Sequence, residues 1–255
     1  MSDKLISIVM PMHNAERFIR ETIESILNQT YKNFELIIVD DCSTDSSLEI
    51  VKEYANNDNR IVILKNERNL LVSMTRNNGV AVAKGEMVAL IDSDDKWEPN
   101  FLESVKKRQS ETGARLVNAS YKFIDNEGNL LMKEFVVKEK TTYKDMLKQN
   151  TISCSAVFVE KELLLKYPFY ADEVHEDYLC WLSIMKEIKE AYGVLDTVSI
   201  YRLTTGSKSR NKFKAIKMSY FTYRKHGCNV IKSLFYTFCN ALNGLKKYSG
   251  VKKKR

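Results

Sequence analysis

Residues 87–97, Met87-Val-Ala-Leu-Ile-Asp-Ser-Asp-Asp-Lys-Trp97, decide the fold of this chain because they join an apolar run to a cluster of carboxylates. The run from Met87 to Ile91 follows a turn signal and is wholly apolar, so we expect a strand buried on both faces. Asp92, Asp94 and Asp95 come directly after it. Ligands of an open α/β sheet bind beyond the carboxyl ends of its strands. The stretch therefore predicts a buried strand that ends at a binding site.

Three acidic side chains within four residues repel one another, and a divalent cation or hydroxyl groups would share their charge. Mg²⁺ and Mn²⁺ prefer oxygen ligands, and they typically take one or two protein carboxylates beside water and substrate phosphate. The alternative is a polar turn ahead of a helix that opens at Trp97-Glu98-Pro99. The position of the cluster at the end of a buried strand favours a cation site.

Upstream of this stretch, apolar runs alternate with amphipathic segments. Strands are expected at 5–10, 34–39 and 61–64, and helices at 15–29, from about Ser46 onward and at 73–83. Four strands separated by three helices within about ninety residues require right-handed crossovers and a mostly parallel sheet. The first half is therefore expected to be an α/β domain of the nucleotide-binding type.

Downstream, the pattern is less regular. Further elements are expected at 101–111 (helix), 114–120 (strand), 121–137 (hairpin), 153–159 (strand), 176–188 (helix) and 198–202 (strand). The chain of 255 residues contains neither internal repeats nor low-complexity linkers. This length suits one large domain, or one domain with an appendage.

The cysteines and the apolar runs limit the classes of protein to which this chain can belong. The five cysteines are an odd number, widely spaced and without a Cys-x-x-Cys motif, which indicates a reduced, cytosolic protein without disulfides or zinc. The N-terminal apolar run is too short and too poorly flanked for a signal peptide. No apolar run reaches the roughly 18 residues that a membrane span needs.

The net charge of +7 is distributed unevenly. Residues 208–255 hold 14 Lys and Arg and no Asp or Glu, which leaves 26 basic and 33 acidic groups in the rest of the chain. Two helices are expected in this basic segment, followed by Lys252-Lys-Lys-Arg255, which is too charged to fold. An acidic body with a basic end indicates an anionic partner, either nucleic acid or phospholipid.

Three of the expected strands end in polar groups: Pro11-Met-His-Asn14, Asp40-Asp41 and Asp92-Ser-Asp94. With Arg76-Asn77, they resemble the family 2 glycosyltransferases, which are inverting sugar transferases with the GT-A fold. The resemblance covers about residues 4–205, and the matching segments are 6–14, 29–31, 34–41, 76–79, 85–86, 90–95 and 175–178. Similarity is closest to the bacterial enzymes that build surface polysaccharides such as O-antigen or capsule.

The resemblance implies an α/β, Rossmann-like and mostly parallel central sheet flanked by helices over residues 1–207. Within this GT-A domain, 1–97 would be the nucleotide-binding half and 98–207 the acceptor-side half. The activity implied is that of a metal-dependent hexosyl- or N-acetylhexosaminyltransferase that uses a UDP-sugar donor and Mn²⁺ or Mg²⁺.

The resemblance also implies roles for the nucleotide-binding residues. Asp41 would accept a hydrogen bond from uracil N3–H, and Arg76 would pair with phosphate through its planar fork. Asp94 would ligate the cation that bridges the two phosphates, and Asp92 would hold the ribose or uridine side and serve as the second metal residue. The remaining nucleotide-sugar-binding residues would be Pro11, His13, Asn14 and Glu16. The alternatives are that Asp41 or Ser43 caps the following helix, and that Arg76 is a surface residue at a helix start.

Asp177 falls where the family carries its catalytic base. It would take the proton from an acceptor hydroxyl as that oxygen attacks the anomeric carbon opposite UDP, which inverts the anomeric centre. The alternative is that Glu176 and Asp177 only favour the first turn of a helix through its dipole. Some relatives place a histidine after the last strand, whereas residues 201–207 contain none, and Arg202, Thr205 or Ser207 would have to close over the diphosphate instead.

The basic segment also contains an apolar stripe. Its second part has apolar residues at steps of three and four: Val230, Ile231, Leu234, Phe235, Phe238 and Leu242. Such a stripe suits a bilayer interface, and it is too short and too broken by Lys232 to cross a membrane. We therefore expect residues 208–255 to bind an anionic membrane surface at the cytoplasmic face of the inner (plasma) membrane, where the acceptor would be a saccharide carried on a polyprenyl diphosphate. The alternative is a core-packing helix pair, especially over Met218–Tyr223.

Other functions fit the sequence less well. A nucleotidyltransferase that makes sugar nucleotides would need a glycine-rich loop after its first strand, and Pro11-Met-His-Asn14 has no glycine. A phosphatase with an aspartyl nucleophile would carry its Asp-x-Asp after the first strand. Nucleic-acid binding is indicated only by the basic end and would leave the acidic cluster unexplained, so no nucleic-acid partner is expected.

Overall fold

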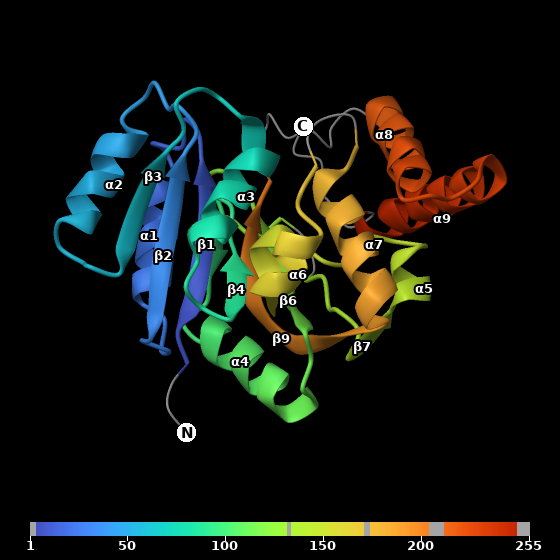
Figure 1. The fold of residues 1–255 in the computed structure, drawn as a ribbon, viewed down its shortest axis with the longest axis horizontal. Helices are drawn as coiled ribbons and strands as arrows, with labels where there is room; N and C mark the ends of the chain where they lie inside the picture. The colour runs from blue at the N-terminus through green and yellow to red at the C-terminus, as the bar shows by residue number, and fades with distance from the viewer. Residues whose placement is uncertain (1–3, 132–133, 171–173, 204–211, 249–255) are drawn as a thin grey trace.

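The computed structural model describes residues 4–131, 134–170, 174–203 and 212–248 (Figure 1). The strands are β1 (Ile6–Met12), β2 (Phe34–Asp40), β3 (Ile61–Lys65), β4 (Met87–Leu90), β5 (Lys96–Trp97), β6 (Leu116–Ile124), β7 (Lys140–Thr142), β8 (Val157–Glu160) and β9 (Glu190–Arg202). In the described part of the chain they form one sheet in the order β3-β2-β1-β4-β8-β6-β9-β5, and β7 pairs with β9 outside this path.

The helices cover both faces of this sheet. They are α1 (Ile19–Leu27), α2 (Ser47–Ala55), α3 (Leu71–Val82), α4 (Phe101–Thr112), α5 (Tyr143–Met146), α6 (Lys161–Lys166), α7 (Glu176–Ile188), α8 (Lys212–Lys225) and α9 (Val230–Tyr248), with a 3₁₀ turn at Cys154–Ala156. One hydrophobic core joins α1, α2 and α4 to one face of the sheet. A second core joins α3, α6 and α7 to the opposite face (Figure 1).

The predicted four-stranded α/β half is confirmed. Strands β3, β2, β1 and β4 are parallel neighbours, with Met12 beside Asp40 and Val9 beside Leu90. All seven residues of β1 and of β2 are buried, as expected for apolar runs covered by helices on both faces. Because the strands are parallel, their polar carboxyl ends lie at the same edge of the sheet.

Helix α3 packs closely against β1 and β2. Its Gly79 faces β1 and β2, and a Cβ atom there would lie 2.5 Å from the Val9 side chain and 3.1 Å from that of Val39. Only glycine permits so close an approach without displacing the strands. The close packing brings Thr75 and Arg76, one turn earlier on α3, toward the carboxyl ends of the strands.

Beyond β4 the sheet differs from the expectation in several places. Strand β8 pairs antiparallel with both β4 and β6, whereas β6 and β9 are parallel. Lys96 and Trp97 form a strand against β9, so the alternative in which a helix opens at Trp97 is wrong and α4 begins at Phe101. The expected strand at 198–202 is only the end of β9, which begins at Glu190. Elements β7, α5 and α6 were not predicted.

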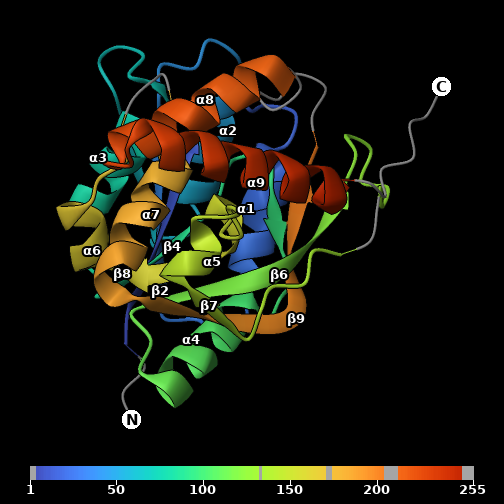
Figure 2. The same ribbon diagram turned by 90° about the vertical axis from the view of Figure 1, so that its right-hand side faces the viewer.

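The two helices expected in the basic segment are α8 and α9. Figure 2 shows α9 on the side of the molecule turned to the viewer, with α8 and α7 next to it. For α8 the core-packing alternative is correct, because Tyr223 is fully buried and its ring contacts that of Tyr178 on α7. The proposed boundary at residues 207–208 and the Lys252–Arg255 end lie outside the described residues. Within the described residues, no helix is both long and apolar enough to span a membrane.

Candidate active site

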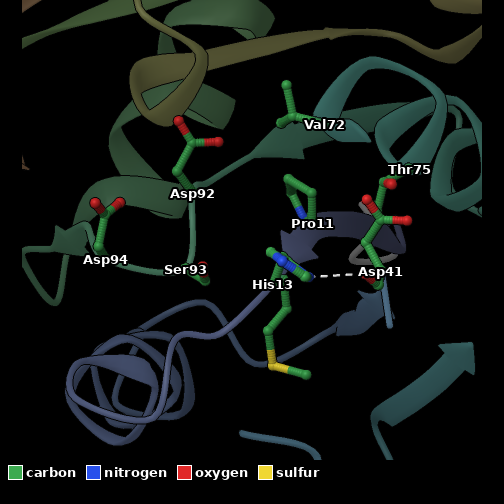
Figure 3. A pocket seen from close by; sticks show the side chains of 9 residues that line it. Pro11, His13, Asp41, Val72, Thr75, Asp92, Ser93 and Asp94 are labelled. Atoms are coloured by element: carbon green, nitrogen blue, oxygen red, sulfur yellow. Dashed lines mark hydrogen bonds between the residues drawn. The ribbon is translucent and has the colours of Figure 1, made fainter. Parts of the chain in front are cut away.

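A cavity of about 230 Å³ opens at the carboxyl edge of the parallel strands (Figure 3). Its lining residues come from the ends of β1, β2 and β4 and from α3: Pro11, Met12, His13, Asp41, Val72, Thr75, Asp92, Ser93 and Asp94. Asp41 and Thr75 lie on one side of the cavity in Figure 3, and Asp92 and Asp94 lie on the other. The sequence therefore identified both ends of this cavity, but it did not identify Met12, Val72, Thr75 or Ser93.

Asp41 is held rigidly at the end of β2. Its Oδ1 atom accepts hydrogen bonds from Asn66 Nδ2 at 2.8 Å and from the backbone N–H of Leu70 at 2.7 Å. It does not cap α2, because the N–H of Ser47 in the first turn of that helix donates to Asp45 instead. The capping alternative is therefore wrong for Asp41, and the side chain is fixed as a cavity wall.

His13 follows β1 and lies against the backbone of Asp41. Its Nδ1–H donates to the Asp41 carbonyl oxygen at 2.8 Å (Figure 3), which fixes the tautomer and leaves Nε2 as an acceptor. The imidazole is solvent-exposed at the mouth of the cavity. In this position its ring is free to contact a planar ligand.

Asn14 and Glu16 were expected at the nucleotide, but the structure places neither in the cavity lining. The Asn14 side-chain oxygen accepts from Thr44 N at 2.8 Å, and Glu16 accepts from Ser46 N at 3.0 Å. Both side chains tie the turn after β1 to the loop that precedes α2. Asn14 also adopts a positive φ of 49°, a conformation that asparagine tolerates better than most residues.

Arg76 is buried in the middle of α3, so the alternative of a surface arginine at a helix start is wrong. Its Nη2 atom lies 2.5 Å from Asp92 Oδ1, and its guanidinium lies over the Phe169 ring. Burial lowers the pKa of Arg76, but the charge and hydrogen bond of Asp92, together with Cys154 and Glu176, outweigh burial and raise the pKa above its usual value. Arg76 Nε and Nη1 have no hydrogen-bond partner in the described part of the chain. The pair therefore retains unused N–H donors beside the cavity.

Asp94 is one of two carboxyl groups at this end whose pKa is raised. Burial and the neighbouring Asp92 raise the pKa of Asp94 to about 6. The next residue, Asp95, is also buried, and its pKa is raised by burial and by the charges of Asp94 and Asp92. This crowding of carboxyl groups is the electrostatic situation that a bound cation would relieve.

Arg202 holds the loop that contains Asp94 and Asp95. Its Nε donates to the Asp94 carbonyl at 2.9 Å, and its backbone N–H donates to Asp95 Oδ1 at 2.7 Å. Its Nη atoms contact Glu21 and the carbonyls of the 125–126 turn. Arg202 is thus committed to protein contacts and is not placed to close over a diphosphate. Thr205 and Ser207 lie outside the described residues.

Asp177 lies in the first turn of α7, outside the cavity lining. Its Oδ2 atom accepts a hydrogen bond from Asn150 Nδ2 at 3.2 Å. Burial raises the pKa of the Cys154 thiol. The positive charge of Arg76 lowers this pKa, whereas the negative charges of Asp177 and Asp92 raise it further. The charges of Asp177 and Asp92 thus act on the same buried thiol. Asn150 was not singled out in the sequence, where it lies in an unremarkable polar segment.

The carboxylates at the acidic end of the cavity could hold a divalent cation only together with water and substrate. Among the described residues, no group of three or more His, Cys, Asp and Glu side chains is arranged to hold a metal alone. Asp94 and Asp92 supply two carboxylates, and one Asp92 oxygen is already engaged by Arg76. This donor set suits Mg²⁺ or Mn²⁺, which complete their shell with water and substrate phosphate.

The family model described as Glycosyl transferase family 2 matches residues 7–161, which include every residue of the cavity lining. The chain belongs to glycosyltransferase family 2. This membership favours the transferase over the nucleotidyltransferase, phosphatase and nucleic-acid-binding alternatives raised by the sequence.

Two relatives match this family 2 glycosyltransferase over almost its whole length. It is 36% identical over 251 residues to the UDP-Glc:alpha-D-GlcNAc-diphosphoundecaprenol beta-1,3-glucosyltransferase WfgD of Escherichia coli, covering 98% of this chain and 97% of WfgD. It is 34% identical over 244 residues to TuaG of Bacillus subtilis (strain 168), a glycosyltransferase named for teichuronic acid biosynthesis, covering 95% of this chain and 97% of TuaG.

The fold of the glycosyltransferase is also found in a solved structure. Residues 1–349 of TarS from S. aureus, in complex with UDP-GlcNAc, superpose with a TM-score of 0.76 at 19% identity. The match covers 95% of this chain and 75% of that one. The expected GT-A fold, a central and mostly parallel sheet flanked by helices, is therefore confirmed.

Proposed function

We propose that this protein is an inverting transferase that moves a sugar from a UDP-sugar to a hydroxyl of a saccharide linked to a polyprenyl diphosphate. The product would enter a bacterial surface polysaccharide. The observation that carries the proposal is one cavity with Asp41 at one side and the Asp92–Asp94 pair at the other. The substrates in the name of WfgD support the donor and the acceptor, and the UDP-GlcNAc bound to TarS supports the donor class.

The uridine would lie between Asp41 and His13. A carboxylate accepts a hydrogen bond well from an imide N–H, and Asp41 is pre-organised by Asn66 and Leu70. The exposed imidazole of His13 offers a flat surface beside it. Pro11 forms the floor between them as part of β1. These residues would fix the donor before chemistry begins, and Asn14 and Glu16 would contribute by holding the surrounding turn.

The diphosphate would lie at the Asp92–Asp94 side. Asp92 would face the ribose, and Arg76, which is buried behind Asp92 and does not line the cavity, would act on the phosphates through the N–H groups that have no partner among the described residues. When bound by Asp94 and Asp92, a divalent cation would neutralise the charge on the departing diphosphate. Asp94 and Asp95 are kept in place by Arg202, so the loop would not need to rearrange when the donor binds.

Asp177 would act as the general base. Its carboxylate would accept the proton of the acceptor hydroxyl while that oxygen forms a bond to the anomeric carbon and the bond from this carbon to the UDP oxygen breaks. Attack from the face opposite UDP inverts the anomeric centre in a single displacement. The hydrogen bond from Asn150 would orient the carboxylate for this transfer.

The function can be tested without knowing the natural sugar. The purified protein should release UDP from at least one member of a panel of UDP-sugars in the presence of Mn²⁺, because transferases of this type hydrolyse their donor slowly when no acceptor is present. We expect release above background with UDP-glucose or a UDP-N-acetylhexosamine. The proposed donor class would be contradicted if the UDP-sugars neither bind nor turn over while GDP- or dTDP-sugars do.

Helix α9 supports the membrane part of the proposal because it exposes apolar side chains and buries small polar ones. The outward side chains, called here the α9 stripe, are Val230, Ile231, Leu234, Phe235, Phe238 and Leu242. Ile231 is 78% exposed and Phe238 is 64% exposed, whereas Ser233 and Thr237 face inward and are buried. A helix that packs on a protein and faces water has the opposite arrangement. A continuous exposed apolar face of this kind marks an interaction site.

An anionic bilayer is the partner that fits the α9 stripe best. Lys232 lies exposed on the same helix, and Lys217, Arg224 and Lys225 are exposed on α8. No acidic residue occurs from 203 to 255 to oppose them. Each basic group near an anionic leaflet contributes about 1 kcal/mol. Apolar insertion and charge attraction would together hold the protein at the cytoplasmic face of the membrane, where a polyprenyl-linked acceptor lies.

Replacing Ile231 and Phe238 together by glutamine should weaken binding to phosphatidylglycerol-rich vesicles by at least about tenfold, since each buried apolar side chain contributes about 1.5–3 kcal/mol. Vesicle co-sedimentation at low salt measures the effect. The matched control replaces Leu130 and Leu195, which are also at least half exposed but belong to other segments of the chain, by glutamine. Equal binding of the stripe variant and the control would contradict the proposal, as would failure of the wild type to bind.

A further inference from the structure

Three segments that are distant in sequence meet around the first turn of α7. They are the loop after α5 (residues 146–150), residues 175–178 at the start of α7, and residues 222–223 of α8. Contacts among them surround the segment that carries Asp177. None of these contacts belongs to the donor cavity, whose lining comes from β1, β2, β4 and α3.

Thr222 holds the residue that precedes α7. The backbone N–H of His175 donates to Thr222 Oγ1 at 3.0 Å, and the same hydroxyl donates to the Met218 carbonyl within α8 at 2.9 Å. His175 is the N-cap residue of α7, so its N–H has no partner within that helix. The His175 ring also reaches α8, where Nε2–H donates to the Ala215 carbonyl at 3.2 Å. Helix α8 thus fixes the entry of the chain into α7.

Tyr223 holds the residue that follows Asp177. Its hydroxyl lies 2.8 Å from that of Tyr178 and 3.0 Å from the Leu147 carbonyl oxygen, and its one proton is shared between these two acceptors. The Tyr178 hydroxyl donates to the Met146 carbonyl. Both tyrosines are buried, and burial raises the pKa of both hydroxyls, so they remain protonated donors. Asn150, in the same loop, donates to Asp177 itself.

The contacts converge on one short backbone segment. Thr222 acts on His175, two residues before Asp177, and Tyr223 acts on Tyr178, one residue after it. The loop that receives the tyrosine hydrogen bonds also supplies Asn150, which binds the Asp177 carboxylate. The carboxylate is therefore constrained through the backbone of His175, through the side chain of Tyr178 and through its own oxygen, and two of these three constraints depend on α8.

We propose that Thr222 and Tyr223 of α8 are positioning residues for Asp177, so that α8 is part of the catalytic apparatus and does more than join a membrane helix to the body. The proposal rests on Asp177 being the base. Removing either hydroxyl frees the segment that carries the base while leaving the donor cavity intact. Since a displacement of about an ångström in a reacting group can cost roughly a hundredfold in rate, loss of one of two such constraints should reduce turnover by about tenfold.

The test compares substitutions that keep the packing but change the hydroxyl. Thr222→Val is nearly isosteric, Thr222→Ser keeps the hydroxyl, and Thr237→Val is the matched control. Thr237 is a buried threonine on α9 whose hydroxyl has no partner among the described residues. Tyr223→Phe provides an independent variant at the second contact. Steady-state kinetics with the UDP-sugar selected by the donor screen give kcat and KM, and calorimetry gives the affinity for UDP.

We expect Thr222→Val and Tyr223→Phe to lower kcat about tenfold, with KM for the donor and the UDP affinity within about twofold of wild type. Thr222→Ser should restore kcat, and Thr237→Val should leave it unchanged. Wild-type kcat in both Thr222→Val and Tyr223→Phe would overturn the proposal, and so would a loss of kcat in Thr237→Val equal to that in Thr222→Val. A weakened affinity for UDP would also overturn it, because it would show a general disturbance of the fold.

A separate variant distinguishes this proposal from the function on which it rests. If Asp177→Asn loses turnover while the α8 variants do not, the base assignment stands and the positioning role is wrong. If Asp177→Asn turns over at the wild-type rate, the base assignment itself is wrong.

Discussion

Asp177→Asn is expected to reduce the rate of sugar transfer by about a hundredfold or more, the usual cost of losing a general base. The amide keeps the size of the side chain and can still contact Asn150, but it cannot accept the proton of the acceptor hydroxyl. The donor cavity does not include Asp177, so UDP should bind with near-normal affinity. Calorimetric titration with UDP and a transfer assay with acceptor measure the two properties separately.

The matched control for this variant is Glu162→Gln. Glu162 is an exposed acid in the first turn of α6, as Asp177 is an acid in the first turn of α7. If acids at these positions serve only the helix dipole, both variants should behave alike, with a loss of stability of about 0.3–1 kcal/mol and no change in rate. An undiminished rate in Asp177→Asn, or a product whose NMR couplings show a retained anomeric configuration, would refute the assigned mechanism.

Asp94→Asn is expected to abolish most activity while the protein remains folded, because it removes a carboxylate that would hold a divalent cation and so the charge neutralisation that the cation would supply to the departing diphosphate. Excess EDTA should silence the wild type for the same reason, and Mn²⁺ or Mg²⁺ should restore it. Asp196→Asn, at an exposed position on β9, serves as the control for loss of one negative charge. Full turnover of the wild type in EDTA would rule out a role for the metal.

The elevated pKa of Asp94 gives this prediction a readout that does not depend on activity. Because the folded-state pKa of about 6 exceeds the ordinary value of 3.8, Asp94 contributes stability below its ordinary pKa, and this contribution is lost as the pH rises through 6. A cation binds the ionised carboxylate. Mn²⁺ should therefore raise the melting temperature more at about pH 7.5 than at about pH 5 in the wild type, and the difference should vanish in Asp94→Asn.

The parallel half of the fold was predictable because its central strands are continuous apolar runs. Strands β1 and β2 bury every residue, so nothing in them conflicts with the pattern of a doubly covered strand. Strand β9 was predicted only over its last residues. Its register against β6 shifts between Val194 and Thr197, and at this irregularity Leu195 and Asp196 are exposed, which breaks the periodicity.

The residues of the candidate site also divide into those that the sequence predicts and those that it does not. Asp41, Asp92 and Asp94 were predictable because a parallel sheet places the ends of its strands together. The ion pair of Arg76 with Asp92 was not predictable, because it depends on how closely α3 packs against β1 and β2 at Gly79. The contact of Asn150 with Asp177 and those of α8 with residues 175–178 join segments that have no periodic relation in the sequence.

The hydrogen bond between His175 and Thr222 also sets an order of events during translation, because its partners are 47 residues apart in the chain. The four parallel strands end at Leu90, and Arg202, which holds Asp94 and Asp95, also precedes α8, so the donor half is made before α8. At about 5–20 residues per second, synthesis of the chain from His175 to Thr222 takes several seconds. A nascent or prematurely terminated chain that stops between residues 203 and 222 would contain Arg202 but lack the support that Thr222 gives to the segment carrying Asp177, so we expect such fragments to bind donor and release little product.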